Sequence, residues 1–191
     1  MTDPVDGVLG LALGGNKGRI GPLFAKALFS KAGSSPPQTF AFYLDDVGKD
    51  SWIDFGGFKK DAIKKGRTDK IKWLKVKKDN FFWSTSCLGI GFGSIKKPEK
   101  IIKFRDLFGD DKVYTVFNTG ETKTKIPFPI WDLFLAYLMN PDSVSAITFK
   151  LLRGQVFLPC QDRDRLPPLY FLFEDNKWLV MDPKDYSYPT G

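Results

Sequence analysis

Short apolar runs, separated by glycine, proline or charged residues, follow one another along most of the chain. Runs of this kind, several of them alternating or rich in aromatic and β-branched residues, are typical of β-strands. Two segments instead carry apolar residues at helical spacing behind a proline, at 22–29 and within 127–141. The pattern therefore predicts a mainly β fold with two or three short helices. The segments that predict strands are residues 40–44, 52–57, 71–76, 81–92, 101–104, 146–152, 169–173 and 178–181, and residues 5–13 predict a short strand and turn.

One segment is rich in glycine at alternate positions. Residues 89–94 read Gly-Ile-Gly-Phe-Gly-Ser, which is close to the pattern of a loop that cradles phosphate. It does not complete Gly-x-Gly-x-x-Gly, and no helix pattern follows promptly, so it lacks the context of a nucleotide-binding loop. We predict a glycine-rich turn here, at the end of the strand expected over residues 81–92.

The positive charge of the chain is concentrated in one segment. The net charge is +7, but residues 59–78 alone hold ten lysines and arginines against two aspartates, and the rest is close to neutral. Such a segment could bind an acidic protein, an anionic membrane or RNA phosphate, with Trp73 and residues 81–83 stacking on bases. Alternation at Lys72, Lys75 and Lys77 favours a solvated face instead. The candidate partner-binding residues are Lys59, Lys60, Lys64, Lys65 and Arg67.

The cysteine and histidine content excludes several kinds of chemistry. The chain has no histidine, so it contains no Ser-His or Cys-His nucleophile pair. Its two cysteines, Cys87 and Cys160, are too few for a structural zinc site and could form one disulfide or remain free thiols. We expect neither a metal nor a cofactor.

The chain carries no recognisable targeting or membrane-spanning segment. Its start, Met1-Thr2-Asp3-Pro4, has neither the basic residues nor the apolar core of a signal peptide. No stretch approaches the ~20 apolar residues of a membrane span. These features predict a cytoplasmic protein by default, or a secretory or vacuolar-lysosomal one if the chain is part of a longer protein.

The triplet Asn118-Thr119-Gly120 follows an apolar run and precedes the helix pattern behind Pro127. In this context it resembles the second catalytic loop of the pepsin and cathepsin D family of aspartic proteases, which reads Asp-Thr-Gly. Further stretches resemble that family in the same order. They are residues 6–11 (Asp-Gly-Val-Leu-Gly-Leu), 40–44 (Phe-Ala-Phe-Tyr-Leu), 53–57 (Ile-Asp-Phe-Gly-Gly), 73–76 with 82–83 (Trp-Leu-Lys-Val and Phe-Trp), and 166–173 (Leu-Pro-Pro-Leu-Tyr-Phe-Leu-Phe) followed by Tyr186.

The resemblance implies one lobe of the family's double-β-barrel fold. Residues 1–36 would be a remnant of the end of the N-terminal lobe, and residues 37–191 a C-terminal lobe that is incomplete at its C-terminus. It also implies that Cys160 corresponds to half of a disulfide whose partner would lie beyond the chain. The family's catalytic loop would fall on Asn118, Thr119, Gly120, Glu121 and Thr122.

The residues at this loop argue against catalysis. The family's mechanism needs two carboxylates about 3 Å apart that share one proton, one from each lobe. Here Asn118 stands in place of the aspartate, Glu121 follows the glycine where a small hydroxyl residue is usual, and the first lobe is absent. A homodimer would present two asparagines and would not restore the pair of carboxylates.

Three interpretations follow. The first is an aspartic-endopeptidase-like chain, catalytically inactive alone, that acts as a binding or structural subunit with a protein partner or as a homo-oligomer. The second is a fragment or half of an active endopeptidase, which would take a polypeptide substrate only with a complementary lobe. The third is a module that binds anions or nucleic acid through residues 59–78.

Overall fold

A computed structural model describes residues 8–13, 24–31, 37–44, 51–59, 63, 71–77, 81–94, 97–110, 113–121, 123–142, 147–152 and 155–188. The chain forms two compact units. Unit 1 contains residues 1–73 and 78–83, and unit 2 contains residues 74–77 and 84–191. The predicted boundary after residue 36 rests on the resemblance and stays a prediction.

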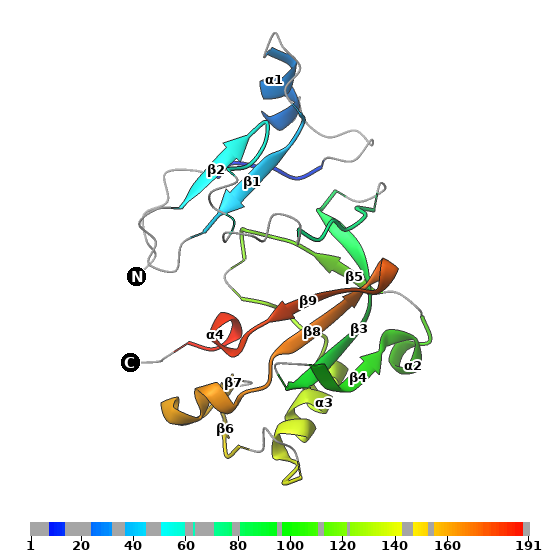
Figure 1. Cartoon of the computed structure of the whole chain (residues 1–191), viewed down its shortest axis with the longest axis vertical. Coiled ribbons are helices and arrows are strands. Elements are labelled where there is room, and N and C mark those ends of the chain that lie inside the picture. Colours follow the sequence, from blue (N-terminus) through cyan, green and yellow to red (C-terminus); the bar gives the residue numbers. More distant parts are fainter. Residues whose placement is uncertain are drawn as a thin grey trace. The chain divides into compact units, whose positions relative to one another are not determined.

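Unit 1 is an antiparallel hairpin with one helix (Figure 1). Strand β1 (Phe40–Tyr43) pairs with β2 (Trp52–Phe55), so that Phe40 lies opposite Phe55. Helix α1 (Phe24–Lys31) brings the ring of Phe24 to 6.1 Å from that of Phe55. The indole of Trp83 packs edge-on against Phe40 and donates a hydrogen bond to the Leu11 carbonyl oxygen at 2.8 Å. Aromatic side chains thus hold this small unit together.

Unit 2 is built on a five-stranded antiparallel sheet with β3 (Ser84–Ser94) at its centre (Figure 1). The first half of β3 pairs with β5 (Val113–Val116), and the second half pairs with β4 (Lys97–Lys103). On its other side β3 pairs with β8 (Leu169–Phe173), which pairs in turn with β9 (Lys177–Met181).

Short helices and one hairpin surround this sheet. Helix α2 (Phe104–Phe108) follows β4 directly, and α3 (Phe128–Met139) begins behind Pro127. A two-stranded sheet, β6 (Lys150–Leu152) with β7 (Gln155–Phe157), leads to the 3₁₀ helix η3 (Cys160–Arg165). The 3₁₀ turn η4 (Glu174–Asn176) joins β8 to β9, and α4 (Pro183–Tyr186) follows β9.

The hydrophobic core lies in unit 2, between the sheet and α3. Ile130, Phe134 and Leu138 are buried and recur every four residues, so they form one stripe along α3. The ring of Phe134 packs against that of Phe92 on β3, with their centroids 5.4 Å apart. Phe92 is fully buried, and Phe173 on the neighbouring strand belongs to the same cluster. The apolar helix pattern of the sequence therefore covers the central strand.

Most of the predicted elements are confirmed. The structure is mainly β with short helices, and helices stand at both predicted places, as α1 and α3. Strands lie within the predicted segments 40–44, 52–57 and 169–173, and a strand over Lys177–Met181 covers the predicted segment 178–181. The described strands form open antiparallel sheets. No helix in the described part of the chain is long and apolar enough to span a membrane.

Three predictions fail within the described residues. Residues 8–13 form no strand, although residues 5–13 predict a short strand and turn. Residues 71–77 form no strand, although their side chains alternate in the sequence. The Lys77 backbone N–H donates to the Ser84 carbonyl oxygen on β3 at 2.9 Å. The glycines at 89, 91 and 93 form no turn but lie inside β3. A Cβ at Gly89 would come within 2.6 Å of the Ile102 carbonyl oxygen on β4. These glycines allow β3 and β4 to approach each other closely. In the sequence, glycines of this kind look the same as the glycines of a turn.

Candidate functional site

The loop after β5 is the site that the sequence singles out. β5 consists of β-branched and aromatic residues and pairs with the first half of β3, so that Val116 lies opposite Ser84. This pairing fixes where the chain leaves the sheet. From Val116 to Glu121 all side chains are exposed. Thr122 lies outside the described residues.

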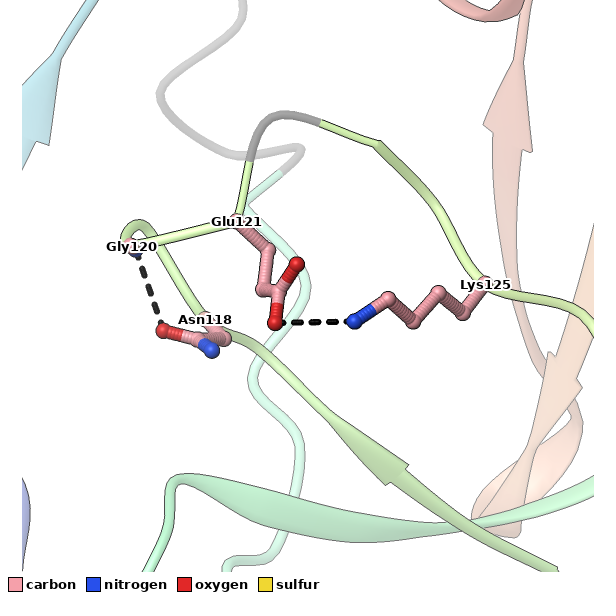
Figure 2. A network of polar contacts seen from close by, with 4 residues as sticks. All are labelled: Asn118, Gly120, Glu121 and Lys125. Atoms are coloured by element: carbon pink, nitrogen blue, oxygen red, sulfur yellow. Dashed lines mark hydrogen bonds and ion pairs between the residues drawn. The ribbon is translucent and has the colours of Figure 1, made fainter. Parts of the chain in front are cut away.

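Asn118 shapes this loop through its own side chain. Its Oδ1 accepts a hydrogen bond from the backbone N–H of Gly120 at 3.0 Å, and its carbonyl oxygen accepts one from the Glu121 N–H at 3.3 Å (Figure 2). A side-chain acceptor two residues before its donor is an Asx turn, which asparagine and aspartate form readily. The carboxamide oxygen is therefore engaged in local structure.

Among the described residues of the loop, Glu121 is the one that carries a carboxylate. Its Oε1 lies 2.9 Å from Nζ of Lys125, and both side chains are exposed. Figure 2 shows the Glu121 carboxylate directed toward Lys125, while the Asn118 carboxamide reaches back to Gly120. An exposed pair of this kind contributes about 0–1 kcal/mol to stability. In this arrangement the Glu121 carboxylate pairs with a lysine and not with a second carboxylate.

The arrangement has little capacity for acid-base catalysis. A carboxamide neither ionises nor shares a proton at ordinary pH, so Asn118 cannot activate water as a general base. Nor do the described residues gather three cysteine, aspartate or glutamate side chains that could hold a metal ion. What the loop offers instead is a surface of backbone groups and an exposed amide.

An apolar surface adjoins the loop. Tyr114, Val116 and Phe117 are 57%, 44% and 49% exposed, although β5 belongs to the main sheet. We call these three residues the β5 face. Lys77 lies over the ring of Tyr114, with Nζ 5.2 Å from its centroid, and Phe117 stacks on the buried ring of Phe173 at 6.4 Å. Each of the three side chains thus remains about half open to solvent, and two of them have a described neighbour.

Only the first of the basic candidates lies within the described residues. Lys59 is exposed, with its Nζ 4.6 Å from the ring centroid of Trp52. Its backbone N–H donates to Oδ2 of Asp54 at 3.1 Å, and the Trp52 indole donates to the same oxygen at 3.2 Å. Lys59 thus belongs to a local network on the β1–β2 hairpin. Lys60, Lys64, Lys65 and Arg67 lie outside the described residues.

The two cysteines are free thiols in different surroundings. Cys87 is buried in β3, with Sγ within 3.4 Å of the carbonyl oxygens of Gly89 and Leu172. Burial raises the pKa of the Cys87 thiol, which makes it a poor nucleophile. Cys160 is exposed at the start of η3. Of the two alternatives that the sequence left open, the structure has the unpaired one.

A second site was not predicted from the sequence. Unit 2 contains an open-sided cavity of about 710 Å³, lined by residues of α3, β7, η3, α4 and the segment before α3. Phe134, Leu138, Leu166 and Leu169 form part of its wall, and all four are buried core residues. The volume is within the range of small-molecule sites. Its residues come from segments far apart in the sequence, so no local motif could have signalled it.

Charged groups line the same cavity. Lys123, Arg163, Lys184 and Asp185 belong to its lining. Arg163 is half-buried and donates from Nε to the Ser187 hydroxyl at 3.0 Å and from Nη2 to the carbonyl oxygens of Lys184 and Ser187 at 3.1 and 2.9 Å. One sequence signal did exist for this region. Asp182-Pro183 followed by Asp185 is a helix-start pattern, and the backbone N–H of Asp182 donates to Asp185 at 3.1 Å.

No known protein-family model matches the chain. The interpretation of its function therefore depends on the loop, the β5 face and the cavity.

Proposed function

We propose that the chain is a catalytically inactive relative of the pepsin-like aspartic proteases that acts as a binding or structural subunit. In this proposal residues 37–191 correspond to the C-terminal lobe of the double-β-barrel fold, and residues 1–36 to a remnant of the lobe before it. The observation that carries it is the loop after β5, where Asn118 forms an Asx turn. In the proposal, Asn118 corresponds to the catalytic aspartate of the motif. An asparagine preserves the turn of an aspartate and removes its ionisation.

Two further observations support the loss of catalysis. Glu121, the carboxylate nearest in sequence, is paired with Lys125. The loop is also exposed, whereas a proton-sharing pair of carboxylates depends on a site that excludes water. Losing a single acid-base group lowers a rate by about 10²–10⁴-fold, and this chain would lack both.

The β5 face supports a binding role. Exposed apolar patches that adjoin an ordered strand commonly mark protein interfaces. In the proposed role this face contacts a partner protein or a second copy of the chain, and the loop provides backbone hydrogen-bonding groups at its rim. The alternative in which the chain is half of an active protease would need the partner to bring both missing carboxylates.

An activity assay with a matched variant tests the proposal. We expect the purified chain to show no acid-optimum cleavage of denatured protein, and Asn118→Asp to show none either, because a single carboxylate cannot form the dyad. Thr119→Ala serves as a control for changes in the loop that leave residue 118 intact. Cleavage by the unmodified chain that a transition-state-mimicking aspartic protease inhibitor blocks would refute the proposal.

A further inference from the structure

The cavity in unit 2 combines an apolar wall with positive charge. Its wall includes Trp131, Phe134 and Leu158, which contact the core cluster or belong to it. Three cations and one carboxylate lie around this wall. The carboxylate, Asp185, accepts a hydrogen bond from the backbone of Asp182. The cavity as a whole therefore carries an excess of positive charge beside a hydrophobic surface.

Arg163 is the group best suited to meet an anion. All the acceptors of its hydrogen bonds among the described residues are uncharged, namely one hydroxyl and two carbonyl oxygens. These bonds use Nε and Nη2 and fix the plane of the guanidinium, which leaves Nη1 for a further acceptor. A half-buried charge that is hydrogen-bonded only to neutral groups gains from an anionic partner, because local screening by water is reduced.

Lys184 lies beside this arginine. The backbone carbonyl oxygen of Lys184 accepts from Arg163, so this part of α4 lies against the guanidinium, and Lys184 also lines the cavity. Lys123 contributes a third cation from the segment before α3. The ion pairs found among the described residues involve none of these three side chains.

We propose that this cavity binds a small amphipathic carboxylate, that is, a medium-length aliphatic chain ending in a carboxylate group. The aliphatic chain lies against Trp131, Phe134 and Leu158, and the carboxylate faces Arg163 and Lys184. A neutral apolar molecule would leave the cations unmet, and a multiply charged polar anion would leave the apolar wall uncovered. The occupant is independent of whether the chain cleaves peptides, since the site shares no group with the loop at 118–121.

The first experiment measures calorimetric binding of dodecanoate to the full chain, with dodecanol and dodecyltrimethylammonium as probes of the same length. We expect saturable binding of one dodecanoate per chain. Dodecanol should bind at least about tenfold more weakly, and dodecyltrimethylammonium should not bind. Shortening the carboxylate by one methylene should weaken binding about fourfold. Equal binding of the acid and the alcohol, or no binding of dodecanoate, overturns the proposal.

Charge variants place the headgroup. Lys184→Glu and Lys123→Glu change exposed side chains, so both variants should fold and weaken dodecanoate binding by tenfold or more. Lys100→Glu, on β4 and outside the cavity, is the matched control and should bind like the unmodified chain. Arg163→Gln should abolish binding, and it is interpreted only if its circular dichroism is native. Unchanged binding in both lysine variants overturns the proposal.

Cys160 offers a second readout that does not depend on charge. It lines the cavity and is exposed, whereas Cys87 is buried, so a bulky maleimide should label Cys160 selectively. We expect dodecanoate to slow this labelling and the labelled protein to lose dodecanoate binding. Cys160→Ser treated with the same reagent should bind normally. Labelling that dodecanoate leaves unchanged, with labelled protein that still binds it, overturns the proposed location.

Discussion

At the scale of single residues, Tyr186 shows how burial alters a side chain that also lines the cavity. Its hydroxyl donates to the carbonyl oxygen of Pro167 at 2.5 Å, and burial raises the pKa of this hydroxyl well above its ordinary value. The neutral form is therefore the one that the folded state favours. Because the pKa is raised in the folded state, stability is complete below the ordinary tyrosine pKa of about 10 and falls as the pH rises above it.

Replacing Tyr186 with phenylalanine tests this. At pH 8 we expect Tyr186→Phe to lower the free energy of unfolding by about 1–2 kcal/mol, because the carbonyl of Pro167 loses its donor. Above pH 10 the unmodified chain should lose about 1.4 kcal/mol per pH unit through Tyr186, so the difference between the proteins should nearly vanish by pH 11. Denaturant titrations at both pH values measure this difference in the free energy of unfolding.

The control for this variant is Tyr188→Phe, at a side chain that is exposed two residues further on. It should unfold like the unmodified chain at both pH values. A difference between Tyr186→Phe and the unmodified chain that stays constant from pH 8 to pH 11 would contradict the assignment of the alkaline loss to Tyr186.

Some residue-scale features could be predicted from the sequence and others could not. The turn at Asn118 can be predicted, because an asparagine two residues before a glycine has a known local hydrogen-bonding pattern. The free state of the two cysteines could not, since pairing depends on the distance between β3 and η3 in the fold. The hydrogen bonds of Arg163 could not be predicted either, because their acceptors lie more than twenty residues away in the sequence.

At the scale of elements, the contact between β3 and β4 depends on glycine. A Cβ at Gly93 would lie 2.3 Å from the Glu99 nitrogen and 2.9 Å from its Cβ, and the pairing register shifts between Phe92 and Gly93. A Cβ at Gly89 would lie 2.6 Å from a backbone oxygen of β4. Backbone atoms cannot move aside as the end of a flexible side chain can, so β4 itself would have to shift.

We therefore expect Gly93→Ala to destabilise unit 2 by about 1–3 kcal/mol, the usual cost of forcing extra atoms into a packed site. Hydrogen exchange of the β3 and β4 amides measures this locally. Gly57→Ala is the control, because a Cβ there meets nothing within 4 Å, and it should change stability little. Native protection of the β4 amides in Gly93→Ala would contradict the close approach of the two strands.

Elements with strong local patterns were predictable, and those defined by their neighbours were not. Helix α3 can be predicted, because its apolar stripe and the preceding proline are local signals. The glycines of β3 predict a turn in the sequence, because close packing of strands and chain reversal require the same residue type. Residues 71–77 alternate like a strand, yet the described chain provides them no partner strand, and a strand pattern without a partner forms no ladder.

At the scale of the whole molecule, the sequence predicted a mainly β protein with few helices but not the cavity or the surface that partners could use. The cavity collects residues from α3, η3 and α4, whose proximity is a property of the tertiary fold alone. The exposure of the β5 face is likewise a property of the tertiary fold. Tyr114 and Val116 look in sequence like ordinary strand residues, and only the sheet order shows that β5 pairs with β3 alone among the described strands.

That sheet order has a consequence for association. β5 has a second edge with no partner strand among the described residues, and its exposed side chains include Tyr114 and Val116, with Phe117 directly after them. Strand edges with apolar side chains tend to pair with other chains unless charges protect them. Lys77 lies over Tyr114 and protects only that end of the face.

We therefore expect the purified chain to associate in a concentration-dependent manner through the β5 face, either with itself or with a natural partner. Val116→Glu would place a charge in the contact, where burial without a counter-ion is costly, and should weaken association by tenfold or more. Val180→Glu, the same change at an exposed valine on β9 and outside the β5 face, is the control and should associate normally. Light scattering across a concentration series measures self-association, and affinity capture from the source organism's extract with both variants measures hetero-association. A monomer that captures nothing, or equal association by both variants, would show that the β5 face is not an interface.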